Sequence, residues 1–199
     1  MKKNTNHDRI IKMVGIGIFS AIVVVLQLLG AFIKIGTFSV SLVLIPIVVG
    51  SAVYGKGAGT WLGFLFGVAV LLSGDASTFL AVNVVGTVLT VLLKGTLAGL
   101  VIDYVYSLLS KFNKYLAVLV SAFLCPVINT GVFLLGCKLF FMPTISSWAA
   151  GHDGGTNVVT YMFLVLVGGN FLFELGANIL MSPVILRITD IGLSKSKNK

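Results

Sequence analysis

The sequence predicts an all-α integral membrane protein, a bundle of six transmembrane helices with both termini in the cytoplasm. Apolar residues make up 57% of the 199 residues and charged residues only 10%, whereas soluble domains carry about 25% charged residues. The apolar residues form runs long enough to cross a bilayer as helices. Basic residues gather beside these runs. This composition excludes a soluble enzyme, a nucleic-acid-binding domain and a disordered chain.

The apolar runs divide one membrane domain, residues 1–199, into six expected helices. The first run, from Ile10 to Ile33, is too long for a signal-peptide core, so we interpret it as a retained span. The second and third runs are short for full spans and are joined only by residues 55–57, which predicts a tight hairpin that crosses or partly re-enters the membrane. The expected helices cover about residues 10–33, 39–54, 57–73, 79–110, 115–141 and 158–189.

The net charge of +8 is distributed as membrane topology requires. With the N-terminus inside, eleven of the fourteen basic residues lie in cytoplasmic segments, and only Lys34 and Lys138 lie near outer ends. Cytoplasmic loops carry an excess of Lys and Arg, so this bias supports six helices rather than five. The eleven are Lys2, Lys3, Arg9, Lys12, Lys56, Lys111, Lys114, Arg187, Lys195, Lys197 and Lys199.

The expected outer connections differ in length. Residues 34–38 and 74–78 are short, whereas residues 142–157 form a longer loop with Trp148 and two Gly-rich stretches. Loops of this length in compact proteins are often lids. A lid and a passive connector both fit this segment.

Polar side chains recur at helical spacing within the last three expected helices. Such stripes face protein or a water-filled cavity rather than lipid. The stripes are Asn83, Thr87, Thr90 and Lys94; Ser121, Cys125 and Asn129, followed by Thr130; and Asn170, Glu174 and Asn178.

Lys94 and Glu174 are the ionisable side chains that we place well inside the expected spans. Each lies about 22–24 Å from the outer start of its helix, at 1.5 Å per residue. An isolated charge at such depth is unfavourable, and pairing lowers that cost. We therefore expect the two side chains to meet, either to fix the helix register or to line a ligand cavity.

Small residues recur every four positions on other helices, a spacing that lets helix backbones approach closely. We expect the glycines of the third and fourth helices to pack internally, and the small face of the first helix to contact a partner. The positions are Gly59, Gly63 and Gly67; Gly95 and Gly99; and Gly17 with Ala21.

No catalytic, metal-binding or nucleotide-binding pattern accompanies these features. The two histidines, His7 and His152, lie outside the expected spans, and the chain contains no Walker loop, no Gly-x-Ser-x-Gly and no His-Glu-x-x-His. We therefore expect no enzymatic activity and no cofactor. If the chain transports a solute, six helices suggest that it forms an oligomer or joins a motor partner.

The chain resembles the substrate-binding S components of energy-coupling factor (ECF) vitamin transporters over nearly its whole length. The resemblance lies in the basic N-terminus, the small face of the first helix, and two runs rich in glycine and aromatic residues. The runs are residues 41–50 (SLVLIPIVVG) with 54–59 (YGKGAG), and Trp61, Gly63, Phe64, Phe66 and Gly67.

This resemblance implies a substrate cavity between the fourth, fifth and sixth helices, capped by outer loops. It also implies docking of the first helix onto a membrane partner, the T component, which two ATPases drive. The family's Ala-xxx-Ala docking motif corresponds here to Gly17 and Ala21, which keeps both positions small. The expected substrate-binding residues are Asn83, Thr87, Lys94, Asn129, Asn170 and Glu174.

The vitamin itself is not specified by the sequence. Lys34, Lys94 and Lys138 favour a carboxylated vitamin such as pantothenate, whereas Glu174 would suit a cation such as thiamin if Lys94 does not neutralise it. Cobalt and nickel are not expected, because a His-rich N-terminal ligand set is missing. Two alternatives remain open: a scaffold or assembly protein, whose polar stripes only hold helices together, and a small motor-independent carrier that forms a homo-oligomer.

Overall fold

The computed structural model describes residues 5–30, 34–35, 38–39, 42–152 and 155–197. The elements in chain order are α1 (Thr5–Gly30), β1 (Lys34–Ile35), β2 (Phe38–Ser39), α2 (Leu44–Tyr54), α3 (Ala58–Leu72), α4 (Ser77–Leu80), α5 (Val84–Leu109), α6 (Lys114–Phe140), α7 (Met142–Ala150), α8 (Val158–Thr160), the π-helix η1 (Tyr161–Leu166) and α9 (Gly168–Lys197). The two short strands pair antiparallel, with Lys34 opposite Ser39.

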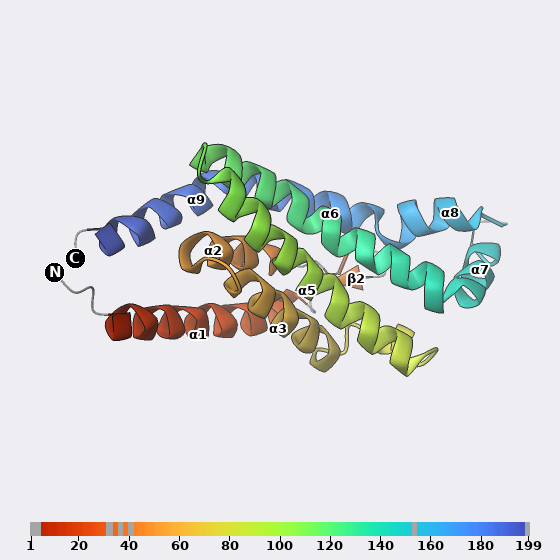
Figure 1. The fold of residues 1–199 in the computed structure, drawn as a ribbon. Helices are drawn as coiled ribbons and strands as arrows, with labels where there is room; N and C mark the ends of the chain where they lie inside the picture. Colours follow the sequence, from red (N-terminus) through yellow and green to blue (C-terminus); the bar gives the residue numbers. More distant parts are fainter. Residues whose placement is uncertain (1–4, 31–33, 36–37, 40–41, 153–154, 198–199) are drawn as a thin grey trace.

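The helices form an elongated bundle with both termini at one end and α7 at the other (Figure 1). Within the described residues, four helices are long and apolar enough to cross a membrane: they include Arg9–Gly30, Val84–Leu109, Lys114–Phe140 and Gly168–Ile191. The shorter apolar helices α2 and α3 complete the six that the sequence predicts. At about 1.5 Å per residue they span only ~16 and ~22 Å, less than the hydrocarbon core.

Several expected segments differ from the structure. The helix expected over 39–54 begins only at Leu44, since Ser39 belongs to β2, and the helix expected over 158–189 is divided into α8, η1 and α9. The helix expected over 79–110 is interrupted, and α5 begins only at Val84, because Asn83 has an extended backbone and its side chain accepts a hydrogen bond from Gly86 N–H at 2.9 Å. This is an N-cap, which starts a new helix. The loop expected over 142–157 contains α7, whose first turn holds Pro143. The expected end of the first span, residues 31–33, lies outside the described residues.

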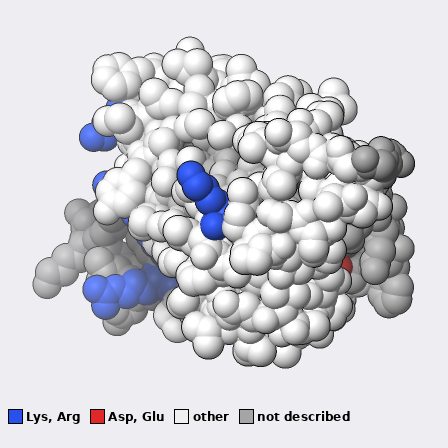
Figure 2. Space-filling model, turned by 90° about the vertical axis from the view of Figure 1, so that its right-hand side faces the viewer, with Lys and Arg blue, Asp and Glu red and all other residues white. Residues whose placement is uncertain are grey.

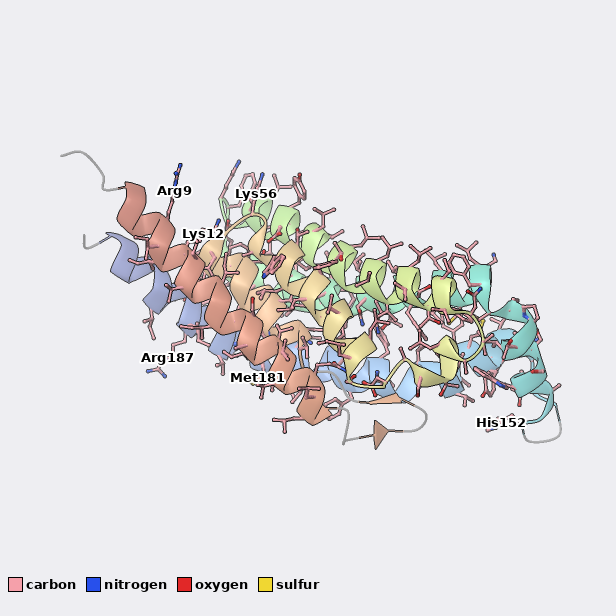
Figure 3. All side chains as sticks on the ribbon, turned by 90° about the horizontal axis from the view of Figure 1, so that it is seen from below. Arg9, Lys12, Lys56, His152, Met181 and Arg187 are labelled. Atoms are coloured by element: carbon pink, nitrogen blue, oxygen red, sulfur yellow. The ribbon has the colours of Figure 1, made fainter. Side chains whose placement is uncertain are left out.

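The two ends of the bundle differ in charge. Arg9, Lys12, Lys56 and Arg187 lie toward the end that holds the termini, and His152 lies at the opposite end (Figure 3). Seen from that opposite end, the surface is mostly uncharged (Figure 2). By the positive-inside rule, the end with the termini faces the cytoplasm.

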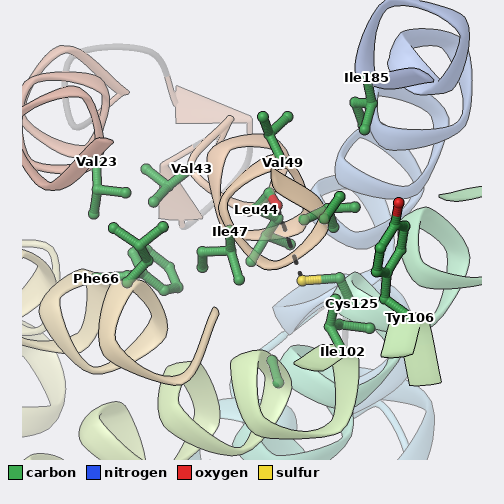
Figure 4. Packing of buried hydrophobic residues seen from close by; sticks show 14 of the residues in the cluster. Val23, Val43, Leu44, Ile47, Val49, Phe66, Ile102, Tyr106, Cys125 and Ile185 are labelled. Carbon is green, nitrogen blue, oxygen red and sulfur yellow. Dashed lines mark hydrogen bonds between the residues drawn. The ribbon is translucent and has the colours of Figure 1, made fainter. Parts of the chain in front are cut away.

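Helix α2 lies at the centre of the apolar core. Its Leu44 and Ile47 are fully buried and belong to one cluster with Val23 of α1 and Ile185 of α9 (Figure 4). Cys125 of α6 lies against the Leu44 carbonyl oxygen in this cluster, with the sulfur at 4.0 Å. A helix that is apolar on all sides is expected at such a position, because it has no face for solvent.

Helices α3 and α5 pack with their backbones in direct contact. A Cβ atom added to Gly63 would overlap the Gly95 carbonyl oxygen, and one added to Gly99 would overlap the Gly59 carbonyl oxygen. Only glycine permits this approach. The predicted internal packing of these glycines is thus what the structure shows.

Asp103 of α5 anchors the start of α3, a role that sequence reasoning missed. Its carboxylate is 3% exposed. It accepts hydrogen bonds from the Gly57, Gly59 and Thr60 N–H groups at 2.9–3.0 Å and from the Ser51 and Thr60 hydroxyls at 2.7 Å. A carboxylate at a helix N-terminus satisfies otherwise free N–H groups and complements the helix dipole. The Gly-rich start of α3, with no acidic residue of its own, is the signal that could have revealed it.

Candidate functional site

A cavity of about 80 Å³ lies among α5, α6 and α9. Residues of α1, α3, α4, η1 and the connections between helices complete its wall. Its lining residues are Gln27, Phe66, Val70, Asp75, Ala76, Phe79, Thr87, Thr90, Val91, Lys94, Asn129, Thr130, Phe133, Phe141, Leu166, Val167, Asn170, Phe171 and Glu174.

The structure brings five of the six residues expected to bind substrate to this cavity: Thr87, Lys94, Asn129, Asn170 and Glu174. The sixth, Asn83, is absent from the described lining, because its side chain caps α5. Since helical spacing placed Asn83 on the same stripe, the break in the helix accounts for the difference. Within the other stripes, Ser121, Cys125 and Asn178 are buried in the bundle outside this lining.

Sequence reasoning missed Gln27 and Asp75, which line the cavity. Gln27 of α1 is 2% exposed, and its Nε2 donates to Asp75 Oδ2 at 2.7 Å and to Ser73 Oγ at 3.4 Å. These bonds tie the first helix to the connection after α3. The available signal was Gln27 itself, a large polar residue near the outer end of a mostly apolar first span.

Lys94 lies against aromatic rings. Its Nζ is 5.4 Å from the centroid of Phe66 and 5.5 Å from that of Phe133, both cation–π distances. Lys94 and Glu174 line the same cavity, but no ion pair within 4.0 Å joins these two described side chains, so the expected direct contact is not formed. Along their helix axes, Lys94 and Glu174 lie about 15 and 9 Å from the first residues of α5 and α9.

Several polar atoms of the cavity wall are buried without a hydrogen-bond partner among the described residues. They are Thr90 Oγ1, Asn129 Oδ1 and Asn170 Oδ1. The Asn170 amide is oriented by its Nδ2, which donates to Glu174 Oε1 at 3.2 Å. Buried polar groups are almost always paired, so such a group needs an explanation, and a missing ligand is one.

Aromatic side chains close the outer part of the wall. Phe79 packs edge-on against Phe133 and Phe141, with ring centroids 5.6 and 4.9 Å apart. Trp148 of α7 contacts Phe79 in the same way at 5.8 Å. The segment expected to be a lid or a connector therefore rests on a residue of the cavity wall.

An irregular turn lies beside the cavity. The π-helix η1 ends at Leu166, and Leu166 and Val167 both line the wall before α9 begins. π-helical turns are rare and occur frequently at functional sites.

The small face of α1 points away from the bundle. Gly17 and Ala21 are exposed, and no atom lies within 4 Å of a Cβ added to Gly17. Large apolar residues on the same helix, among them Met13 and Ile18, are also exposed. This face is therefore open to lipid or to a partner helix.

A sequence model of the family described as the ECF transporter substrate-specific component matches residues 11–189. The chain belongs to this family. It is therefore an S component, a transport subunit of the cell membrane rather than an enzyme, as the sequence predicted. The all-helical bundle agrees with this assignment. The curated proteins and the solved structures contain no match to the chain.

Proposed function

We propose that this S component captures its substrate from the outer side of the membrane in the cavity among α5, α6 and α9. The observation that carries the proposal is that three of the six buried side-chain atoms without partners among the described residues, Thr90 Oγ1, Asn129 Oδ1 and Asn170 Oδ1, lie on the wall of this one cavity. The other three belong to Tyr106, Ser121 and Asn178, outside its lining. A bound ligand would form hydrogen bonds with the three atoms on the wall, and the site would need little rearrangement to accept it.

Five of the residues that we expected from the sequence, together with Gln27 and Asp75, form the polar part of this binding site. The aromatic wall around Phe79 excludes water and contacts the ligand's apolar surface. The contact between Trp148 and Phe79 supports a closing role for α7, since movement of α7 would alter the wall. The substrate is a vitamin or related micronutrient.

Docking of α1 onto the T component, driven by two ATPases, is the second part of the proposal. Its support is the exposure of Gly17 and Ala21, which lets a partner helix approach the α1 backbone. The subunit itself then needs no site for ATP.

The unpartnered atoms also argue against a role as a scaffold. Polar residues that hold helices together bond to one another across the helix interface. Thr90 Oγ1 and Asn129 Oδ1 lack such bonds within the described residues. A motor-independent carrier is the remaining alternative.

Mass spectrometry of small molecules released from the purified protein tests the proposal. We expect one vitamin-like compound at near-stoichiometric level, and its loss from an Asn129→Ala variant that remains folded. A protein that releases nothing and binds no vitamin in calorimetry contradicts the proposal. Uptake that persists in cells without the ATPases would instead favour the motor-independent carrier.

A further inference from the structure

The charges of the cavity wall are unbalanced toward the negative. Three of the described lining residues carry ionisable groups, and two of them, Asp75 and Glu174, are carboxylates. Lys94 is the one basic residue of this described lining. With all three in their ordinary ionised states the described wall bears a net charge of −1.

Both carboxylates are held in place by amide side chains. Gln27 donates to Asp75 at 2.7 Å, and Asn170 donates to Glu174 at 3.2 Å. These amide N–H groups are thus directed at the wall's own carboxylates. The Asn170 oxygen is left as an acceptor, because its amide orientation is set by a carboxylate that accepts.

The positive charge of Lys94 already has aromatic neighbours. Its Nζ lies over the Phe66 and Phe133 rings at 5.4 and 5.5 Å. Such contacts stabilise an ammonium group. Phe171, another aromatic residue of the wall, can contact the flat face of a ligand.

From this arrangement we infer that the cavity selects a small organic cation, a flat ring that bears an amino or positively charged nitrogen, over a carboxylate. The inference rests on the proposed role of the cavity as the substrate site. A cationic ligand would donate charge-assisted hydrogen bonds to Asp75, Glu174 or Asn170 Oδ1. A carboxylate would add a third negative group beside two others and have Lys94 as its only charged partner in the described wall.

This inference favours one of the options that the sequence left open. The carboxylated vitamin was expected from Lys34, Lys94 and Lys138. Lys94 belongs to the described lining and Lys138 does not, while the side chain of Lys34 lies outside the described residues. Asp75, which sequence reasoning did not place in the site, changes the balance of charge.

Three isosteric probes test the inference on the full chain in detergent or nanodiscs. These are 3-(aminomethyl)pyridine, nicotinamide and nicotinate, which share one ring and differ in charge. We expect the dissociation constant, measured by calorimetry, to rise in that order, by about tenfold or more between the cation and the anion, as the loss of one charge-assisted hydrogen bond implies. The molecule released from the purified protein is expected to contain a basic nitrogen.

Variants that neutralise one carboxylate show which residue causes the preference for the cationic probe. Glu174→Gln and Asp75→Asn are each expected to reduce the preference for the cation severalfold, and Asp75→Asn provides the test if Glu174→Gln does not fold. The matched control is Asp190→Asn, since Asp190 is an exposed carboxylate that pairs with Lys114 at 3.6 Å, far along α9 from Glu174. This variant is expected to leave the preference unchanged.

The outcomes separate the two proposals. Nicotinate that binds as tightly as the cation, or a released ligand with a carboxylate and no basic nitrogen, overturns the inferred ligand class and leaves the binding function intact. Equal preference in Glu174→Gln, Asp75→Asn and the wild type also overturns it. If none of the probes binds and no small molecule is released, the proposed function itself fails, and the inference fails with it.

Discussion

Two buried polar residues of α5, one in each half of the helix, differ in their hydrogen bonds. In the half toward the cytoplasm, Asp103 is buried and accepts five hydrogen bonds. In the outer half, Thr90 is buried and its hydroxyl has no partner among the described residues. Both residues lie on one helix that is mostly apolar. Hydrogen-bond satisfaction distinguishes a structural anchor from a group that awaits a ligand.

The packing around the two halves of α5 also differs. Gly99 brings the inner half of α5 into backbone contact with Gly59 of α3. The outer half instead borders the cavity through Thr87 and Lys94. We therefore expect changes in the inner half to reduce stability and changes in the outer half to reduce ligand binding.

The largest loss of stability is expected from Gly63→Ala or Gly99→Ala. In each case the added methyl group overlaps a backbone carbonyl of the facing helix, which cannot move without separating α3 from α5. Overpacking of this kind costs about 1–3 kcal/mol or more. Thermal unfolding in detergent measures it. Gly131→Ala is the matched control, because no atom lies within 4 Å of the added Cβ; equal stability of the three variants would refute the close-packing argument.

Asp103→Asn is expected to destabilise the protein by about 1–3 kcal/mol, as for the loss of hydrogen bonds to a buried charged group. The new amide would direct its N–H groups at the Gly57 and Thr60 N–H groups that the carboxylate now satisfies. Chemical or thermal unfolding provides the measurement. The exposed Asp190→Asn should cost at most about 1 kcal/mol, and a similar loss in both variants would contradict the anchoring role of Asp103.

Asn129→Ala tests the cavity, which borders the outer half of α5. In contrast to the variants above, it should reduce ligand binding rather than stability. Since Asn129 Oδ1 has no partner among the described residues, removing the amide should leave the unfolding temperature of the ligand-free protein nearly unchanged and abolish co-purification of the small molecule. Asn113→Ala is the opposite control. Asn113 caps α6 at the surface, so its loss should cost about 1 kcal/mol while the ligand is retained. If Asn129→Ala unfolds the protein and Asn113→Ala does not, the division between the halves is wrong.

Gly17→Leu and Ala21→Leu should have the smallest effect on the isolated subunit, because both positions are exposed. Stability and ligand content are expected to stay at the wild-type level, while uptake and co-purification with the T component are lost. Ala21→Ser, which keeps the position small, serves as the control. Normal uptake by the leucine variants would remove this face of α1 from the docking surface.

The sequence predicted the membrane class, the long helices and most of the polar residues that line the cavity, because the signals are local. A run of apolar residues indicates a span, and polar residues at intervals of four mark one helix face. The prediction was wrong at Asn83, where an N-cap interrupts the expected helix. Sequence reasoning also missed Asp103, whose hydrogen-bond partners lie more than forty residues away in the chain.

The sequence by itself determined that this protein lies in a membrane, with its basic end inward, since the exclusion of charge from lipid acts on each residue separately. It also determined which polar faces turn away from lipid. Only the tertiary structure decided which of those faces meet. Gln27 and Asp75 enter the cavity from α1 and the α3–α4 connection, and this changes the charge that a ligand encounters. Charge balance in a cavity depends on residues distant in sequence, so no local pattern encodes it.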